Sequence, residues 1–162
     1  MVALIRILVD GYSLLHYWRD LLPGQPPYSA AARDELTRRL RQYGDAEGVP
    51  VTIVFDGSQP VPGPALEISS PDCEVIYSKA GQTADDVIER LAHLLKEYGE
   101  VLVVTDDHAE RDTVLSLGGL VSSCENFIRS LEMALKHMGQ RLKHHRLKTR
   151  HTRPFNPILR PT

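Results

Sequence analysis

Short runs of aliphatic residues recur along the chain and predict β-strands. Four runs cover residues 2–9, 50–55, 73–77 and 101–105, and a brief fifth run covers residues 120–121. Few polar residues interrupt these runs, whereas a strand with one solvated face would alternate apolar and polar residues. The pattern therefore predicts a mostly parallel sheet with both faces covered.

Segments with helical periodicity separate most of these strands. A short helical stretch is predicted at residues 14–19, and longer helices at residues 30–43, 84–98, 108–117 and 122–136. Within residues 84–98, apolar residues recur at the i, i+3 and i+4 spacing of one helix face. The alternation of strands and helices predicts a single α/β domain whose central sheet is flanked by helices.

Residues with short, oxygen-bearing side chains stand where the predicted helices begin. Such side chains accept hydrogen bonds from the unpaired backbone N–H groups of a first helical turn. The predicted caps are Ser29, Thr83 with Asp86, Asp107 with Glu110, and Ser122 with Glu125. Residues 58–72 are rich in Pro, Gly and Ser, and we expect them to form a long loop.

The composition fits one globular domain in a reducing compartment. The chain has 162 residues, of which 42% are hydrophobic, enough for a single core. No apolar run is long enough to span a membrane, and the first residues lack a signal-peptide pattern. Cys73 and Cys124 are far apart and have no metal-binding spacing. We expect both cysteines to be small buried residues, and the protein to be cytoplasmic.

The net charge of −2 conceals a sharp division along the chain. Residues 1–135 contain 11 Lys and Arg against 21 Asp and Glu, whereas residues 136–162 contain 8 Lys and Arg and no acidic residue. A basic segment of this kind is typical of a nucleic-acid-binding arm, or is a solvated tail that only aids solubility. It has no apolar stripe for a membrane surface.

Aspartates follow three of the predicted strands, and another lies at the start of the clearest helix. Asp10, Asp56 and Asp106 follow strands, and Asp85 lies in the first turn of the helix at residues 84–98. Because the carboxyl ends of parallel strands share one edge, we expect these side chains to converge. Gathered carboxylates suit Mg²⁺ or Mn²⁺, which promote phosphodiester hydrolysis. Each aspartate also has a structural interpretation, in a turn or at a helix start.

The adjacent residues Asp85 and Asp86 are expected to have different roles. On a helix their side chains point about 100° apart, so one cation is not expected to bind both equally. Asp85 flanks the apolar face and therefore lies nearer the sheet. Asp86 faces solvent more, and is either a further ligand or only a cap of the helix.

Competing chemistries lack their sequence signatures. The chain contains no GxxxxGK[ST] loop, no GxGxxG fingerprint and no GxSxG nucleophile motif. A P-loop nucleotide hydrolase, a dinucleotide-binding enzyme and a serine hydrolase are therefore not expected.

Several segments together resemble the YacP-like group of NYN domains, within the PIN-like nucleases. The resemblance covers roughly residues 4–135 and rests on VDGYSLLH, VFDG, QTADDVIERL, VTDDHAER and SSCENFIRSLE after a Gly-Gly pair. The TADDVIERL segment is also similar to the acidic helix of the 5′-nuclease domains of DNA polymerases. One departure is that Ser13 stands where the family usually has the Asn of DGYN.

The resemblance implies a parallel sheet with a carboxylate cluster that binds Mg²⁺ or Mn²⁺. It also implies endoribonuclease activity, which in some members is coupled to the translating ribosome. Residues 1–135 would form the PIN-like (NYN) nuclease domain, and residues 136–162 a basic C-terminal extension. The family acids correspond to Asp10, Asp85 and Asp106.

We therefore predict a metal-dependent endoribonuclease that cleaves RNA phosphodiester bonds. The predicted catalytic residues are Asp10, Asp85 and Asp106, with Asp86 as a further metal ligand. The predicted RNA-binding residues are Ser13, Lys79, Arg141, Lys143, Arg146, Lys148, Arg150 and Arg153.

Two alternatives remain at this stage. One is an RNA- or ribosome-binding module with little or no catalysis, in which the acidic residues are remnants. The other is a small phosphatase or nucleotide hydrolase that uses the same metal-binding edge.

Overall fold

The computed structural model describes residues 4–57 and 72–151 of the chain. Five strands form one sheet in the order β3-β2-β1-β4-β5, and all four neighbouring pairs are parallel. The strands are β1 (Leu4–Asp10), β2 (Val51–Phe55), β3 (Cys73–Tyr77), β4 (Glu100–Val104) and β5 (Leu120–Ser122). The predicted parallel sheet is thus confirmed.

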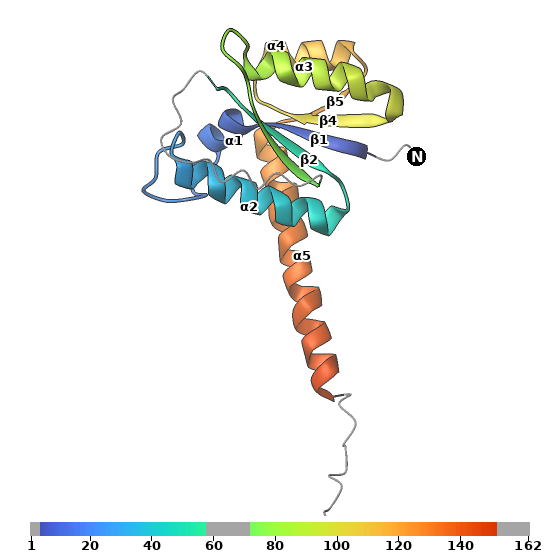
Figure 1. Ribbon diagram of the computed structural model, residues 1–162. Coiled ribbons are helices and arrows are strands. Elements are labelled where there is room, and N and C mark those ends of the chain that lie inside the picture. Colours follow the sequence, from blue (N-terminus) through green and yellow to red (C-terminus); the bar gives the residue numbers. More distant parts are fainter. Residues whose placement is uncertain (1–3, 58–71, 152–162) are drawn as a thin grey trace, which may run out of the picture.

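Helices cover both faces of this sheet, as Figure 1 shows. The helices α1 (Gly11–Tyr17), α2 (Ala30–Glu47) and α5 (Cys124–His151) lie on one face, and α3 (Ala84–Leu95) and α4 (His108–Ser116) lie on the other. In β1 the side chains of Ile7 and Val9 join the first layer, whereas Leu8 joins the second. This alternation explains why the buried part of the strand, from Ile7 to Val9, is apolar at every position.

The central strand β1 lies where the direction of the chain through the sheet reverses. Val9 pairs with Ile53 of β2 on one side and with Val104 of β4 on the other. The chain first builds β2 and β3 on one flank, and then β4 and β5 on the opposite flank. A crevice outside the carboxyl ends of strands forms at such a point and is the usual ligand site of open α/β sheets.

Three of the four predicted helix caps are present. Ser29 Oγ accepts a hydrogen bond from the Ala32 backbone at 3.1 Å, and Thr83 forms a complete capping box with Asp86. Asp107 caps α4, but its predicted partner Glu110 does not close the box. The Glu110 side chain instead points to Thr105, with consequences for the site below.

Several predicted helix boundaries were wrong. α1 begins at Gly11, directly after β1, because Asp10 itself caps the helix. α2 continues to Glu47, and Gly48 caps its end in a left-handed conformation with φ 68°. α3 ends at Leu95 and is followed by the 3₁₀ turn η1 (Lys96–Tyr98). This tighter turn carries Tyr98 out of the predicted apolar face, where its side chain is 76% exposed.

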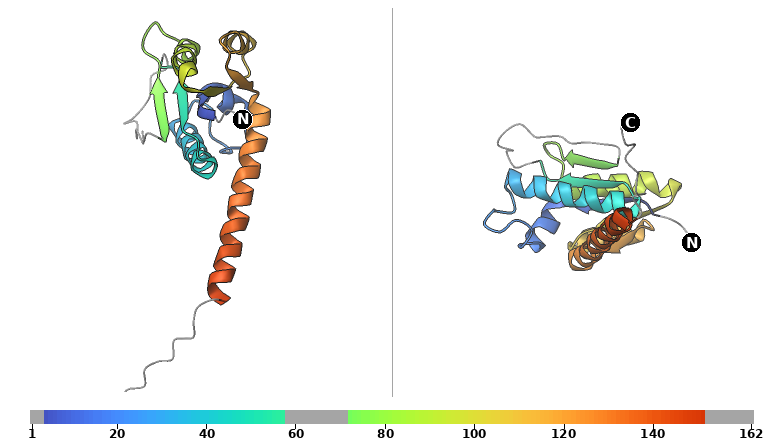
Figure 2. Two further views of the ribbon diagram at one scale, coloured as in Figure 1. Left: turned by 90° about the vertical axis from the view of Figure 1, so that its right-hand side faces the viewer. Right: turned by 90° about the horizontal axis from the view of Figure 1, so that it is seen from below.

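The last helix, α5, differs most from expectation. Its cap is Ser123, whose Oγ accepts from the Asn126 backbone at 3.2 Å, whereas the predicted cap Ser122 belongs to β5. The helix continues to His151 instead of ending near Lys136. Its first turns pack against the domain, and the remainder projects away from it (Figure 2).

Some predicted features lie outside the described residues. The expected loop at residues 58–72 falls there except for its last residue, and so does the end of the basic extension at residues 152–162. Within the described part of the chain, no helix is long and apolar enough to cross a membrane.

Gly11 provides a test of the packing at the start of α1. A Cβ atom at this position would collide with the ring of Phe55, which is fully buried in the core. We expect Gly11→Ala to lower the free energy of unfolding by about 1–3 kcal/mol through overpacking, measured by urea unfolding.

Gly139 in α5 is the matched control for this substitution. A Cβ there meets nothing within 4 Å, so Gly139→Ala should leave stability unchanged or raise it by up to about 1 kcal/mol. A fully stable Gly11→Ala variant would contradict the packing described for β1, α1 and β2.

Candidate functional site

Three carboxylates meet at the carboxyl edge of the sheet. Asp10 ends β1, Asp85 lies in the first turn of α3, and Glu110 lies in the first turn of α4. One oxygen from each lies within 4.8 Å of the others. The three residues come from segments far apart in the sequence, so only the fold brings them together.

The position of Asp10 is fixed by its role at the junction of β1 and α1. Its Oδ1 accepts a hydrogen bond from the Ser13 backbone N–H at 3.3 Å. Gly11 follows because its lack of a side chain allows the helix to turn tightly over the Phe55 ring. The carboxylate of Asp10 is thereby held at the sheet edge, beside those of Asp85 and Glu110.

Glu110 is the most deeply buried of the three carboxylates, with 1% of its side chain exposed. Its Oε2 accepts a hydrogen bond from Thr105 Oγ1 at 2.8 Å. Its Oε1 is buried and has no hydrogen-bond partner among the described residues. An unpaired buried carboxylate oxygen is costly, so such an atom needs a proton or a cation.

The electrostatics of the cluster reflect this crowding. Burial, followed by the charge of Asp10, raises the pKa of Glu110 to about 9. Burial, opposed by the Ser13 hydrogen bond and reinforced by the charge of Asp85, raises the pKa of Asp10 to about 6. The pKa of Asp85 is also raised, chiefly by burial. A divalent cation would relieve both the burial cost and the mutual repulsion.

The donor set fits a hard divalent cation. All three groups offer carboxylate oxygens, which are the ligands that Mg²⁺ and Mn²⁺ prefer. No sulfur or imidazole ligand belongs to the group, so a zinc-type site is not indicated among the described residues. The unpaired Oε1 of Glu110 supplies the structural reason for a cation at this point.

Asp106 lies beside this cluster and is held by a separate set of hydrogen bonds. Its Oδ1 accepts from the Cys124 backbone N–H at 2.9 Å, at the start of α5. Its own backbone N–H donates to Ser13 Oγ at 3.2 Å. The structure does not place Asp106 in the three-carboxylate group, and its role as a metal ligand stays a prediction.

Ser13 and Cys124 complete this second network. Ser13 Oγ lies 3.7 Å from Cys124 Sγ, within hydrogen-bonding distance for sulfur. Cys124 and Cys73 are both buried, as predicted, and neither forms a disulfide with another described residue. Burial raises the pKa of Cys124 to about 12, so this thiol is a structural group rather than a nucleophile.

Other predicted residues surround the cluster. Asp86 is exposed, and its Oδ2 accepts from the Thr83 backbone at 3.0 Å, so it caps α3. Asp56 follows β2, and its Oδ1 accepts from Ser78 Oγ at 3.4 Å. Lys79 is exposed in the connection between β3 and α3, on the same edge of the sheet.

Sequence reasoning assigned Glu110 only a capping role. A signal for its true position was available, because Val114 follows at i+4 and is fully buried in the core. Residues four apart share a helix face, so Glu110 had to point inward as well. A carboxylate on the inward face of a helix near a strand end is a candidate ligand.

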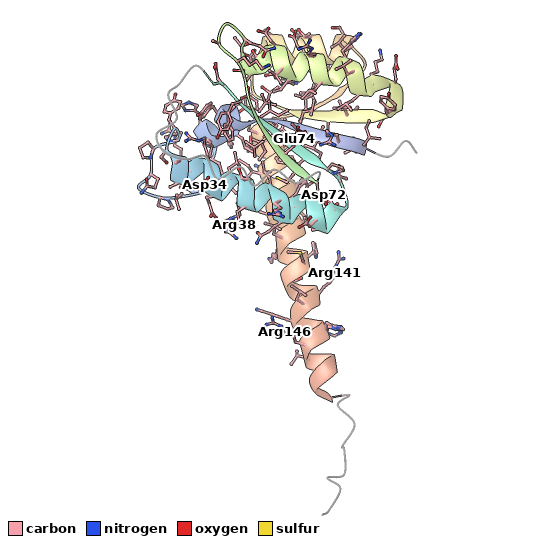
Figure 3. The ribbon with its side chains drawn as sticks, in the orientation of Figure 1. Asp34, Arg38, Asp72, Glu74, Arg141 and Arg146 are labelled. Atoms are coloured by element: carbon pink, nitrogen blue, oxygen red, sulfur yellow. The ribbon has the colours of Figure 1, made fainter. Side chains whose placement is uncertain are left out.

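The predicted RNA-binding cations lie mainly on the projecting part of α5. Arg141, Lys143 and Arg146 are exposed there, and Figure 3 shows Arg141 and Arg146 below the body of the domain. The side chains of Lys148 and Arg150, and the whole of Arg153, lie outside the described part of the chain. From Cys124 to Arg141 the helix rises roughly 25 Å, so these cations are remote from the carboxylates.

The parallel sheet is covered by helices on both faces, and three carboxylates gather at the carboxyl end of its central strand β1. Together these features define an α/β domain with a candidate site for a cation. The model of the YacP-like NYN domain family matches residues 7–158. A curated relative, the uncharacterized protein YacP of Bacillus subtilis (strain 168), is 30% identical over 138 residues, covering 85% of this chain and 81% of that protein.

Solved structures agree with this match. The crystal structure of Rae1 (YacP) from Bacillus subtilis is similar with a TM-score of 0.75 and 28% identity, covering 90% of this chain and 83% of that one. Its W164L mutant gives a TM-score of 0.71 at 28% identity, covering 86% and 81%. The chain belongs to the YacP-like NYN domain family and has its PIN-like nuclease fold.

The raised pKa values predict how stability depends on pH in metal-free protein. The folded-state pKa rises from 3.8 to about 6 for Asp10 and from 4.5 to about 9 for Glu110. At a pH between the unfolded-state and the folded-state pKa of either group, that group binds more protons in the folded state than in the unfolded state. The free energy of unfolding therefore falls as the pH rises through this interval. We expect the free energy of unfolding in EDTA to decline from about pH 4.5 to about pH 9.

Glu110→Gln provides the comparison, measured by urea unfolding across the same pH range. The variant has no charge to bury at this position, so its stability should decline less steeply above pH 6. An equal decline in both proteins would show that Glu110 ionises as freely when folded as when unfolded.

Proposed function

We propose that this protein is a metal-dependent endoribonuclease. The observation that carries the proposal is the meeting of Asp10, Asp85 and Glu110 at the sheet edge, with an unpaired buried oxygen on Glu110. Membership in the YacP-like NYN family supports a nuclease-type hydrolase. RNA as the substrate follows from the family resemblance and from the basic helix.

Asp10, Asp85 and Glu110 would hold the Mg²⁺ or Mn²⁺ ion. When bound, such an ion lowers the pKa of a water molecule and neutralises charge that develops on a phosphate. Thr105 orients Glu110 through its hydroxyl, and Asp107 fixes the start of the helix that carries Glu110. Rigid support of this kind keeps the carboxylates together despite their repulsion.

Ser13 and Asp106 have a positioning role in this proposal. Ser13 Oγ holds the Asp106 backbone, and the α5 amino terminus holds the Asp106 carboxylate. The sequence-based assignment of Asp106 as a metal ligand is not part of this proposal, because Asp106 lies outside the three-carboxylate group and its Oδ1 already accepts from the Cys124 backbone. Lys79, exposed at the same edge, would contact the RNA backbone.

The exposed cations of α5 would attract the RNA through its phosphates. Their distance from the carboxylates means that they would hold RNA several nucleotides away from the cleaved bond. On the strength of the family resemblance, we extend the proposal to messenger RNA on the cytoplasmic ribosome.

Neutralising one carboxylate tests catalysis directly. Asp10→Asn should reduce Mn²⁺-dependent cleavage of single-stranded RNA by about a hundredfold or more, because the cation loses a ligand. RNA affinity in EDTA should persist or rise, because the substitution removes a negative charge near the phosphates. Gel-based cleavage and fluorescence anisotropy measure the two effects separately.

Asp45→Asn is the matched control, since Asp45 is exposed near the end of α2, on the opposite edge of the sheet. It should cleave like the wild type. If wild-type protein with Mn²⁺ cleaves no RNA, even on ribosomes, the RNA-binding module without catalysis is correct. Hydrolysis of generic phosphoesters instead of RNA would favour the small phosphatase.

The role of the projecting helix predicts a measurable salt dependence. Replacing Arg141, Lys143 and Arg146 by Gln removes three phosphate contacts. Each contact on a single strand contributes about 0.7 to the slope of log affinity against log salt. We expect the slope to become shallower by about 2, while cleavage at saturating RNA is little changed.

A charge-matched control is available elsewhere on the domain. Arg41, Arg90 and Lys96 are exposed cations outside the projecting part of α5. Their combined replacement by Gln should change this slope by less than about 0.7, which is the contribution of one phosphate contact. Equal losses in both triple variants would assign the effect to net charge rather than to α5.

A further inference from the structure

A hollow of about 390 Å³ lies beside α1, next to the catalytic edge but separate from the carboxylates. Its floor includes the buried side chains of Leu15, Trp18 and Leu21, and exposed polar residues such as Arg19 and Gln25 stand at its rim. The volume falls at the lower end of the range for small-molecule sites, roughly 300–1,000 Å³. An apolar floor with a few polar groups at the rim is typical of small-molecule sites.

Aromatic side chains connect this hollow to the carboxylates. The ring of Tyr28 lies 5.5 Å from that of Tyr12 and 4.9 Å from that of His16, which also lines the hollow. Tyr12 is two residues from Asp10, and the Tyr28 side chain is 49% exposed. From Asp10 to His16 the chain advances by about 9 Å along α1, a distance that one or two nucleotides can span.

A buried arginine holds these rings in place. The side chain of Arg33 is 5% exposed, and its Nη1 donates to the Tyr28 carbonyl at 2.7 Å and to the Tyr12 hydroxyl at 3.4 Å. Tyr12 also packs edge-on against Phe55 at 5.1 Å. A rigid aromatic surface loses little entropy when a flat ligand stacks on it.

We propose that this hollow is a subsite for an unpaired nucleobase of the RNA, adjacent to the nucleotide being cleaved. The inference rests on the proposed function and adds to it a binding site outside the metal centre. The base would enter over Trp18 and stack at the margin of the hollow on Tyr28, whose ring packs against His16 of the lining. Single-stranded RNA is recognised in this way, by stacking on aromatic residues and by hydrogen bonds to base edges.

Two features favour a nucleobase over another occupant. Arg19 forms no ion pair within the described residues, so its guanidinium is free to meet a base edge or the adjoining phosphate. The hollow lies beside α1, which begins directly after Asp10, so one RNA strand can reach both the hollow and the edge where the scissile phosphate would lie. An apolar side chain from a partner protein is the competing occupant, and the test below separates the two.

Trp18 makes the inference directly measurable, because it is the chain's only tryptophan and lines the hollow. Wild-type protein in EDTA is titrated with a six-nucleotide RNA and with an abasic strand of equal length and charge, at the same salt. The RNA should change the Trp18 fluorescence and bind more tightly, whereas the abasic strand should leave the fluorescence unchanged. Equal affinity and equal fluorescence changes for both strands would overturn the proposal.

Substitutions at Tyr28 locate the stacking surface. Tyr28→Ala should weaken RNA binding by about 5- to 100-fold, the range for loss of one stacked base, and Tyr28→Phe should retain it. Tyr98→Ala is the control, since Tyr98 is exposed in η1, just before β4 and away from the hollow. Full RNA affinity in Tyr28→Ala, with its fold confirmed by circular dichroism, would also overturn the proposal.

The binding assay needs neither metal nor cleavage, so it separates this inference from the nuclease proposal. Base-dependent binding at Trp18 without any cleavage would support the subsite and contradict the nuclease. Cleavage by a protein that binds abasic and normal strands alike would support the nuclease and contradict the subsite.

Discussion

Repulsion among three crowded carboxylates, two of them half-buried and one buried, is the constraint on which the carboxylate edge of this domain depends. Asp10, Asp85 and Glu110 are brought within 4.8 Å of one another by elements that have strong packing reasons of their own. Like charges at this distance in a poorly hydrated setting oppose folding. Packing of the sheet and its two helical layers must therefore offset the free energy of this repulsion. A bound cation would reduce the repulsion and so stabilise the folded domain.

The fold holds this edge through two hydrogen-bonded networks. In one, Thr105 and Asp107 orient Glu110 from the start of α4. In the other, Ser13 and Asp106 tie the start of α1 to the start of α5. Through the second network α5 is anchored at the carboxylate edge, even though its far end projects away from the domain (Figure 2). Substrate held along α5 would thus be held in a fixed relation to the carboxylates.

The sheet and most of its helices could be predicted from local patterns, because the strands are mostly aliphatic and the caps at Ser29 and Thr83 are explicit. The convergence of Asp10 and Asp85 followed from the parallel order of the strands. Glu110 could not be found as easily, because its spacing from Asp107 also fits a capping box. Only the packing of α4, with Val114 inward, decides between the two roles. The length of α5 was missed because its outer half projects away from the domain (Figure 2), so burial against the domain imposes no apolar stripe on its sequence.

The most direct measurement of the metal centre is anomalous diffraction from a crystal soaked in Mn²⁺. We expect a peak within coordination distance, about 2.0–2.6 Å, of the Glu110 oxygen that lacks a partner, with Asp10 and Asp85 as the other protein ligands. A peak at Asp106 that leaves Glu110 uncoordinated, or no peak at this edge at all, would contradict the site described here.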